Sequence, residues 1–176
     1  RLTQANFELG DFSKARADAE KILELESTNT EAKFYLMLID MKESDFNAAQ
    51  TLIGELELAG ITDPRLPFYK GLIEIALGNH KTGKELLIAA DKNPALDPTL
   101  KEKISKMLAG YNEFEFSQGA EDQYLGELLA RGLNQIGEYE LAIYKLKNIL
   151  KNRTDLRDAW NLLGFAYLNL NNTLFA

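Results

Sequence analysis

The chain has 176 residues, no cysteine, and 27 acidic against 20 basic residues, for a formal net charge of −7. The lack of cysteine excludes disulfides, thiolate nucleophiles and cysteine-ligated zinc, and the acidic excess argues against a nucleic-acid backbone as the main partner. No stretch approaches the roughly eighteen consecutive apolar residues of a membrane span, so we predict none. Because the sequence begins at Arg1 without a methionine, we expect the native N-terminus to be absent, and we predict no localisation.

The first half of the chain is predicted to form pairs of helices joined by short turns. Apolar residues recur at helical spacing, and polar clusters interrupt them. Residues 1–9 are predicted to be the end of a first helix, and residues 12–25 the second helix of that pair. Residues 31–58 and 64–93 are each predicted to form a further pair.

The regular pattern breaks after residue 94. Asp97-Pro98 is typical of a helix start, because it combines an N-cap side chain with proline at the first helical position. Apolar residues follow at helical spacing. We therefore predict one extra amphipathic helix over residues 98–116, either unbroken or frayed after Gly110, and a loop over residues 117–120.

The last third of the chain is predicted to return to paired helices. A fourth pair covers residues 121–151, and a fifth begins near Asp155 and stops at Ala176, early in its second helix. Natural helical arrays end in polar capping repeats, and neither end of this sequence resembles one. We expect a fragment of a longer protein, or a chain whose disordered ends are left out.

The predicted turns recur with a fixed period. Gly10, Ser44 and Gly78 follow one another at intervals of 34 residues, and Gly137 and Asn171 are again 34 apart. Glycine and asparagine tolerate the left-handed conformation that ends a helix, so Ser44 is the weakest member of this set. Five residues after each turn begins, a small residue allows two helices to approach closely. These small residues are Ala15, Ala49, Gly83, Ala142 and Ala176.

The sequence Trp160-x-x-Leu163-Gly164-x-x-Tyr167, together with Gly137-x-Tyr139-x-x-Ala142, resembles the tetratricopeptide repeat, a helix–turn–helix unit of 34 residues. The resemblance implies an all-α fold, a right-handed α-solenoid of antiparallel helix pairs, here with one extra helix in its middle. The implied domains are repeats over residues 1–94, the extra helix and a linker over 95–120, and further repeats over 121–176. Some repeats depart from the family pattern: Asn6, Asp40 and Glu74 occupy the position of Tyr167, and Lys33, Pro67 and Gly126 that of Trp160.

The same resemblance implies a concave groove, lined by the first helix of each pair, that holds an extended peptide or a partner helix. We call its two halves the front groove and the rear groove. The front groove comprises Phe34, Tyr35, Leu38, Met41, Lys42, Phe68, Tyr69, Leu72 and Ile75. The rear groove comprises Tyr124, Glu127, Leu128, Arg131, Asn134, Gln135, Asp158, Asn161, Leu162, Phe165, Leu168 and Asn169.

The two halves differ in their chemistry. The front groove is aromatic and aliphatic, so either it accepts apolar anchors of a partner or its residues are core, for instance beneath the extra helix. The rear groove is polar, so either Arg131 reads a carboxylate or backbone groups there or this face is simply solvated. The family's two-carboxylate clamp is not expected, because only Lys42 and Arg131 are suitable cations.

The sequence contains no pattern typical of an active site. The single histidine, His80, falls at the position of Phe12, Phe46 and Tyr139, which favours a packing ring with one polar edge over a catalytic base. There is no glycine-rich phosphate loop, no metal-binding pattern and no nucleophile–base pair. We therefore predict no catalytic residue, no metal ligand and no cofactor.

These observations favour a non-catalytic scaffold for protein–protein interaction, with a peptide or a partner helix held in the groove. One alternative is a regulatory or substrate-recognition region of a larger enzyme. Another is a self-assembly module, in which copies of the chain associate. The expected partner is a protein or peptide rather than a nucleic acid.

Overall fold

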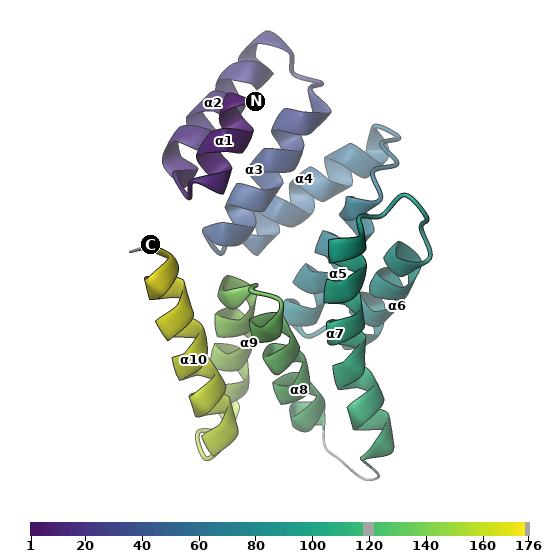
Figure 1. The fold of residues 1–176 in the computed structure, drawn as a ribbon, viewed down its shortest axis with the longest axis vertical. Coiled ribbons are helices and arrows are strands. Elements are labelled where there is room, and N and C mark those ends of the chain that lie inside the picture. The colour runs from purple at the N-terminus through teal and green to yellow at the C-terminus, as the bar shows by residue number, and fades with distance from the viewer. Residues whose placement is uncertain (118–121, 175–176) are drawn as a thin grey trace. The chain divides into compact units, whose positions relative to one another are not determined.

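The fold is all-α in a computed structural model that describes residues 1–117 and 122–174. These residues form ten α-helices and no β-strand (Figure 1). The contacts between helices divide the chain into two units, Arg1–Asp63 and Pro64–Ala176. Within each unit, helices that follow one another in the sequence pack together in pairs, as the repeat pattern predicts.

The first unit contains four helices. They are α1 (Leu2–Glu8), α2 (Phe12–Leu25), α3 (Thr30–Lys42) and α4 (Phe46–Leu58). Two alanines of α2, Ala15 and Ala19, are fully buried in a core with Leu36 and Ile39 of α3. Because an alanine side chain is small, α2 packs closely against both α1 and α3.

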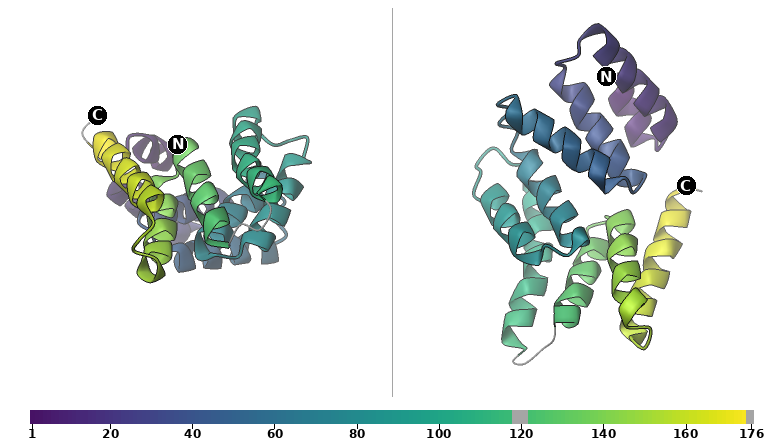
Figure 2. Two further views of the ribbon diagram at one scale, coloured as in Figure 1. Left: turned by 90° about the horizontal axis from the view of Figure 1, so that it is seen from below. Right: turned by 180° about the vertical axis from the view of Figure 1, so that it is seen from behind.

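The second unit contains six helices. They are α5 (Arg65–Leu77), α6 (His80–Asp91), α7 (Pro98–Phe116), α8 (Asp122–Gln135), α9 (Tyr139–Asn152) and α10 (Arg157–Leu174). Besides the pairs of consecutive helices, α9 packs against α5, and α8 contacts both α5 and α10. Figure 2 shows α9 beside α10 from behind.

The extra helix α7 has the predicted range and is unbroken at Gly110. The side chain of Asp97 accepts a hydrogen bond from the backbone N–H of Thr99 at 2.8 Å, and Pro98 occupies the first turn. A Cβ atom on Gly132 of α8 would lie 3.0 Å from the sulfur of Met107. The lack of a side chain on Gly132 thus lets α7 and α8 approach closely, and α7 also packs against α6.

Four of the predicted turns have the expected backbone conformation. Gly10, Ser44, Gly78 and Gly137 have φ values of 76°, 65°, 97° and 80°. Ser44, the weakest candidate by sequence, therefore adopts the left-handed conformation although it carries a side chain. The carboxylates that follow two of these turns cap the next helix. Asp11 accepts a hydrogen bond from the backbone N–H of Lys14, and Asp45 from that of Ala48.

The predicted turn at Asn171-Asn172-Thr173 is wrong, because α10 continues through Leu174. At the other turns a second helix packs back on the first, whereas no helix follows α10 within residues 1–117 and 122–174. The end of α10 then depends only on the conformational preference of the local residues, and asparagine is a weaker helix terminator than glycine. The predicted loop residues 118–120 and the small residue Ala176 lie outside the described residues.

None of the helices in the described part of the chain is both long enough and apolar enough to cross a membrane.

Candidate functional site

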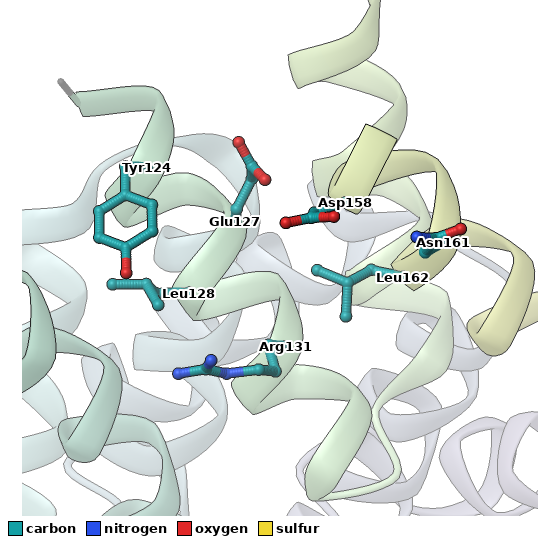
Figure 3. A pocket seen from close by; sticks show the side chains of 7 residues that line it. All are labelled: Tyr124, Glu127, Leu128, Arg131, Asp158, Asn161 and Leu162. Atoms are coloured by element: carbon teal, nitrogen blue, oxygen red, sulfur yellow. The ribbon is translucent and has the colours of Figure 1, made fainter. Parts of the chain in front are cut away.

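Helices α8 and α10 form the two sides of a pocket in the second unit (Figure 3). Its volume is about 360 Å³. Two leucines and five polar or aromatic residues line it, and all seven belong to the predicted rear groove. They are Tyr124, Glu127, Leu128, Arg131, Asp158, Asn161 and Leu162.

Two carboxylates lie next to each other at this pocket. Figure 3 shows them on neighbouring helices, Glu127 on α8 and Asp158 at the start of α10. Burial, and then the charge of Asp158, raise the pKa of Glu127, while Arg153 acts in the opposite direction. Asp158 is exposed and has Arg157 at 3.7 Å. A second cation placed between Glu127 and Asp158 would relieve their repulsion.

Arg131 is already engaged by a carboxylate of the same unit. Its guanidinium donates to Glu113 of the extra helix α7, and the hydroxyl of Tyr124 donates to the other oxygen of Glu113 at 3.1 Å. In Figure 3 the guanidinium points away from Asp158. Glu113 therefore competes with any carboxylate of a partner for Arg131. The sequence alone does not indicate that Glu113 lies beside Arg131.

The remaining rear-groove residues lie outside the lining of the pocket. Asn134 is buried, and its amide donates to the backbone carbonyl of Leu162 at 3.0 Å, so this side chain joins α8 to α10. Asn169 donates to the carbonyl of Phe165 within α10. Phe165 is half-exposed and contacts the ring of Tyr139. Gln135 and Leu168 are exposed.

The front-groove residues belong to two different units and are largely covered. Phe34 and Met41 are buried in the first unit, where Tyr35 and Leu38 are half-buried. The ring of Tyr35 packs against Phe7 and Phe34. In the second unit Phe68, Leu72 and Ile75 are fully buried, and the half-buried Tyr69 packs on Phe68. These positions favour the core interpretation of the front set over an open apolar groove.

Helix α10 also carries apolar side chains outside the pocket. Trp160 and Phe165 are each 50% exposed. Trp160 donates its ring N–H to the carbonyl of Thr154 at 3.0 Å. A Cβ atom on Gly164 would meet no atom within 4 Å in the described structure. Trp160 and Phe165 are therefore only half covered, unlike Phe34 of α3 and Phe68 of α5, which are buried.

A second pocket, of about 240 Å³, lies elsewhere in the same unit, and Lys145 of α9 is part of its lining. The lysine is only 3% exposed. Its amine donates to the backbone carbonyl of Ile75 at 2.8 Å and lies 2.6 Å from Nε2 of His80. The backbone carbonyl of His80 accepts a hydrogen bond from the buried hydroxyl of Tyr111 at 2.7 Å. Burial raises the pKa of that hydroxyl above its ordinary range.

Burial shifts both nitrogen bases toward their neutral forms. It lowers the pKa of Lys145 to about 7. It also lowers the pKa of His80 to about 4; the charge of Lys145 acts in the same direction and Asp122 in the opposite one. The expectation that the chain has no nucleophile–base pair did not take account of this amine and this imidazole, whose nitrogens lie 2.6 Å apart. That expectation stays a prediction.

Sequence reasoning missed Lys145. A signal was present, because Lys145 interrupts the apolar stripe formed by Ala142, Leu146 and Ile149 at helical spacing. Its partner His80 is 65 residues away at the start of α6. The packing of α9 on α5, the helix just before α6, has no local sequence pattern.

No group of residues suited to a metal ion is found among the residues that the structure describes. No family model matches the chain, and the comparisons with curated proteins and with solved structures also return no match.

Proposed function

We propose that this chain is a protein-interaction scaffold of the tetratricopeptide-repeat kind, and that the pocket between α8 and α10 holds a segment of a partner protein. The observation that carries the proposal is the pocket itself. It has about 360 Å³ of space, and its lining contains two leucines and two neighbouring carboxylates on the surface that the repeat pattern assigns to ligand binding. The acidic net charge supports a protein rather than a nucleic-acid partner.

The occupant is a peptide segment that carries a lysine or arginine side chain. Its aliphatic stem fits on Leu128 and Leu162, and its cationic head fits between Glu127 and Asp158. Charge complementarity of this kind sets specificity and the rate of association more than raw affinity. The amide of Asn161 offers a donor and an acceptor to the peptide backbone. Glu113 holds Arg131, so an acidic side chain is the less suitable occupant.

The proposal is tested by selection from a random peptide library on the immobilised protein. The wild type should enrich sequences with Lys or Arg, flanked by apolar residues. Removal of both carboxylate charges by Glu127→Gln with Asp158→Asn should weaken the selected peptides about tenfold or more, since a charge-assisted contact contributes on the order of 1.5–3 kcal/mol. Affinities are measured by titration of labelled peptides at low and at moderate salt.

A matched control removes the same charge from another surface. Glu20→Gln with Glu24→Gln changes two exposed carboxylates of α2 and should leave the affinity unchanged. Three results would contradict the proposal: enrichment of acidic peptides, no enrichment of any sequence, or an equal loss of affinity in the two double variants.

A further inference from the structure

The second pocket of Pro64–Ala176 places a buried amine within reach of solvent-accessible space. Lys145 lies on α9 and lines the pocket together with His80 of α6 and Asp122 and Gln123 of α8. Lys145 is only 3% exposed, and the pocket lining beside it contains both apolar residues and the polar side chains of Asp122, Gln123 and Asn148. Such a site differs from an ordinary surface lysine, whose ammonium group is fully hydrated.

The hydrogen bonds of Lys145 do not use the lone pair of its neutral nitrogen. A neutral amine has two N–H groups and one lone pair. The carbonyl of Ile75 at 2.8 Å and Nε2 of His80 at 2.6 Å use the two N–H groups. The lowered pKa values of Lys145, about 7, and His80, about 4, make this neutral pair well populated at pH 7. Asp122 is the one charged group of α8 in the lining.

We propose that Lys145 is a nucleophilic amine that binds small aldehydes or ketones in this pocket as an imine. The volume of about 240 Å³ suits a compound of a few heavy atoms. Asp122, Gln123 and Asn148 at the pocket lining offer hydrogen bonds to a hydroxyl or ammonium group on that compound. The site is separate from the pocket between α8 and α10, and the inference does not rest on the scaffold function.

The reaction needs no oxidant, reductant or further reactant. The lone pair of Lys145 Nζ attacks the carbonyl carbon, a C–N bond forms, and His80 transfers one N–H proton of the amine to the carbonyl oxygen to give a neutral carbinolamine. His80 then takes the second N–H proton and delivers it to the hydroxyl group, so that the C–O bond breaks, water leaves and the C=N bond forms. The products are one imine and one water molecule, and hydrolysis reverses both steps.

The test uses propanal with cyanoborohydride, which reduces an imine to a stable secondary amine. Peptide mapping by mass spectrometry then compares Lys145 with Lys147 and Lys151, two exposed lysines of the same helix. At pH 7 we expect Lys145 to be modified about tenfold or more faster than either of them, because an ordinary lysine is almost wholly protonated there. Each peptide reports on the same folded molecule, so the comparison is internal.

The pH dependence and two variants complete the test. The rate at Lys145 should level off above about pH 7, whereas the rate at Lys147 should continue to rise toward pH 10. Lys145→Met should remove the fast adduct, and His80→Phe should slow it while circular dichroism shows an intact fold. If Lys145→Met does not fold, the wild-type mapping still decides. Modification of Lys147 as fast as Lys145 at pH 7, or a rate at Lys145 that rises steadily to pH 10, would overturn the proposal.

Discussion

At the scale of single residues, the departures from the repeat pattern have local compensation. Three early repeats carry a polar side chain at the position of Tyr167, where the pattern has a packing ring. Each of the three makes a short hydrogen bond or ion pair with a second polar residue nearby, which offsets the cost of partial burial. The pairs are Asn6 with Asp18 (2.7 Å), Arg16 with Asp40 (2.6 Å) and Asn79 with Glu74 (2.7 Å).

The pH dependence of stability should report the burial of His80. Its pKa is lowered from 6.5 to about 4, so the unfolded chain binds a proton more readily than the folded chain between these values. The free energy of unfolding must therefore fall as the pH drops from 6.5 to 4. This one group contributes a loss of no more than about 3.5 kcal/mol, because each pKa unit corresponds to about 1.4 kcal/mol.

His80→Phe restores the aromatic residue found at Phe12 and Phe46 and removes the titrating group. Its free energy of unfolding should decrease less between pH 7 and pH 4 than that of the wild type, as measured by urea denaturation with circular dichroism. Carboxylates titrate in both proteins and cancel in this comparison. An equal decrease in the two proteins would show that His80 is not held neutral by burial.

At the scale of helices, several helix starts were predictable because local residues determine them, whereas the end of α10 was not. The range of α7 follows from the cap Asp97 and from Pro98, and the starts of α2, α4, α6 and α9 follow from the left-handed turns before them. The packing of α9 on α5 was not predictable, since it joins helices separated by three others in the sequence. The seven residues that line the pocket between α8 and α10 all belong to the predicted rear groove, and the binding role of that groove stays a prediction. The contact of Glu113 with Arg131 depends on how the inserted α7 packs on α8.

At the close contact of α5 with α6, Gly83 should not tolerate a side chain without loss of stability. A Cβ atom on Gly83 would lie 2.5 Å from Cγ1 of Ile75 and 2.9 Å from the carbonyl oxygen of Gly71. Gly83→Ala should destabilise the fold by about 1–3 kcal/mol, because overpacking exceeds the gain in helix propensity. Gly164→Ala on α10 is the matched control, since its Cβ meets nothing within 4 Å and its φ is not positive.

Gly164→Ala should be neutral or stabilising by up to about 1 kcal/mol, which is the helix propensity difference alone. Both variants are compared by chemical denaturation at one pH. A stability of Gly83→Ala equal to that of Gly164→Ala would mean that α5 and α6 separate at little cost, and the close packing of this pair would lose its support.

At the scale of the whole molecule, the break in the repeat period and the division of the contacts fall at different places. The period is interrupted over residues 95–120, whereas the contacts separate the chain between Asp63 and Pro64. The physical reason is that α7 packs on α6 and on α8, so the inserted helix lies within the second unit. A sequence period records which helices form pairs, but it carries no information about which pairs share a core.

Two fragments distinguish these divisions. Residues 64–176 retain α5 to α10 with their mutual contacts and should melt as one cooperative transition. Residues 95–176 begin at the interruption of the period and lack α5 and α6. In that fragment Lys145 loses both the Ile75 carbonyl and His80, Tyr111 loses the carbonyl of His80, and α7 loses the neighbouring helix α6.

The loss of the hydrogen bonds of Lys145 and the newly exposed apolar surface together should cost several kcal/mol, a large part of the stability of a small domain. We therefore expect the fragment 95–176 to show reduced helicity and a broad, weakly cooperative thermal transition by circular dichroism, whereas the fragment 64–176 melts sharply. If the shorter fragment melted as sharply and at the same temperature, the contacts of α5 and α6 with α7 to α9 would contribute little to stability. The division at the interruption of the period would then be the physical one.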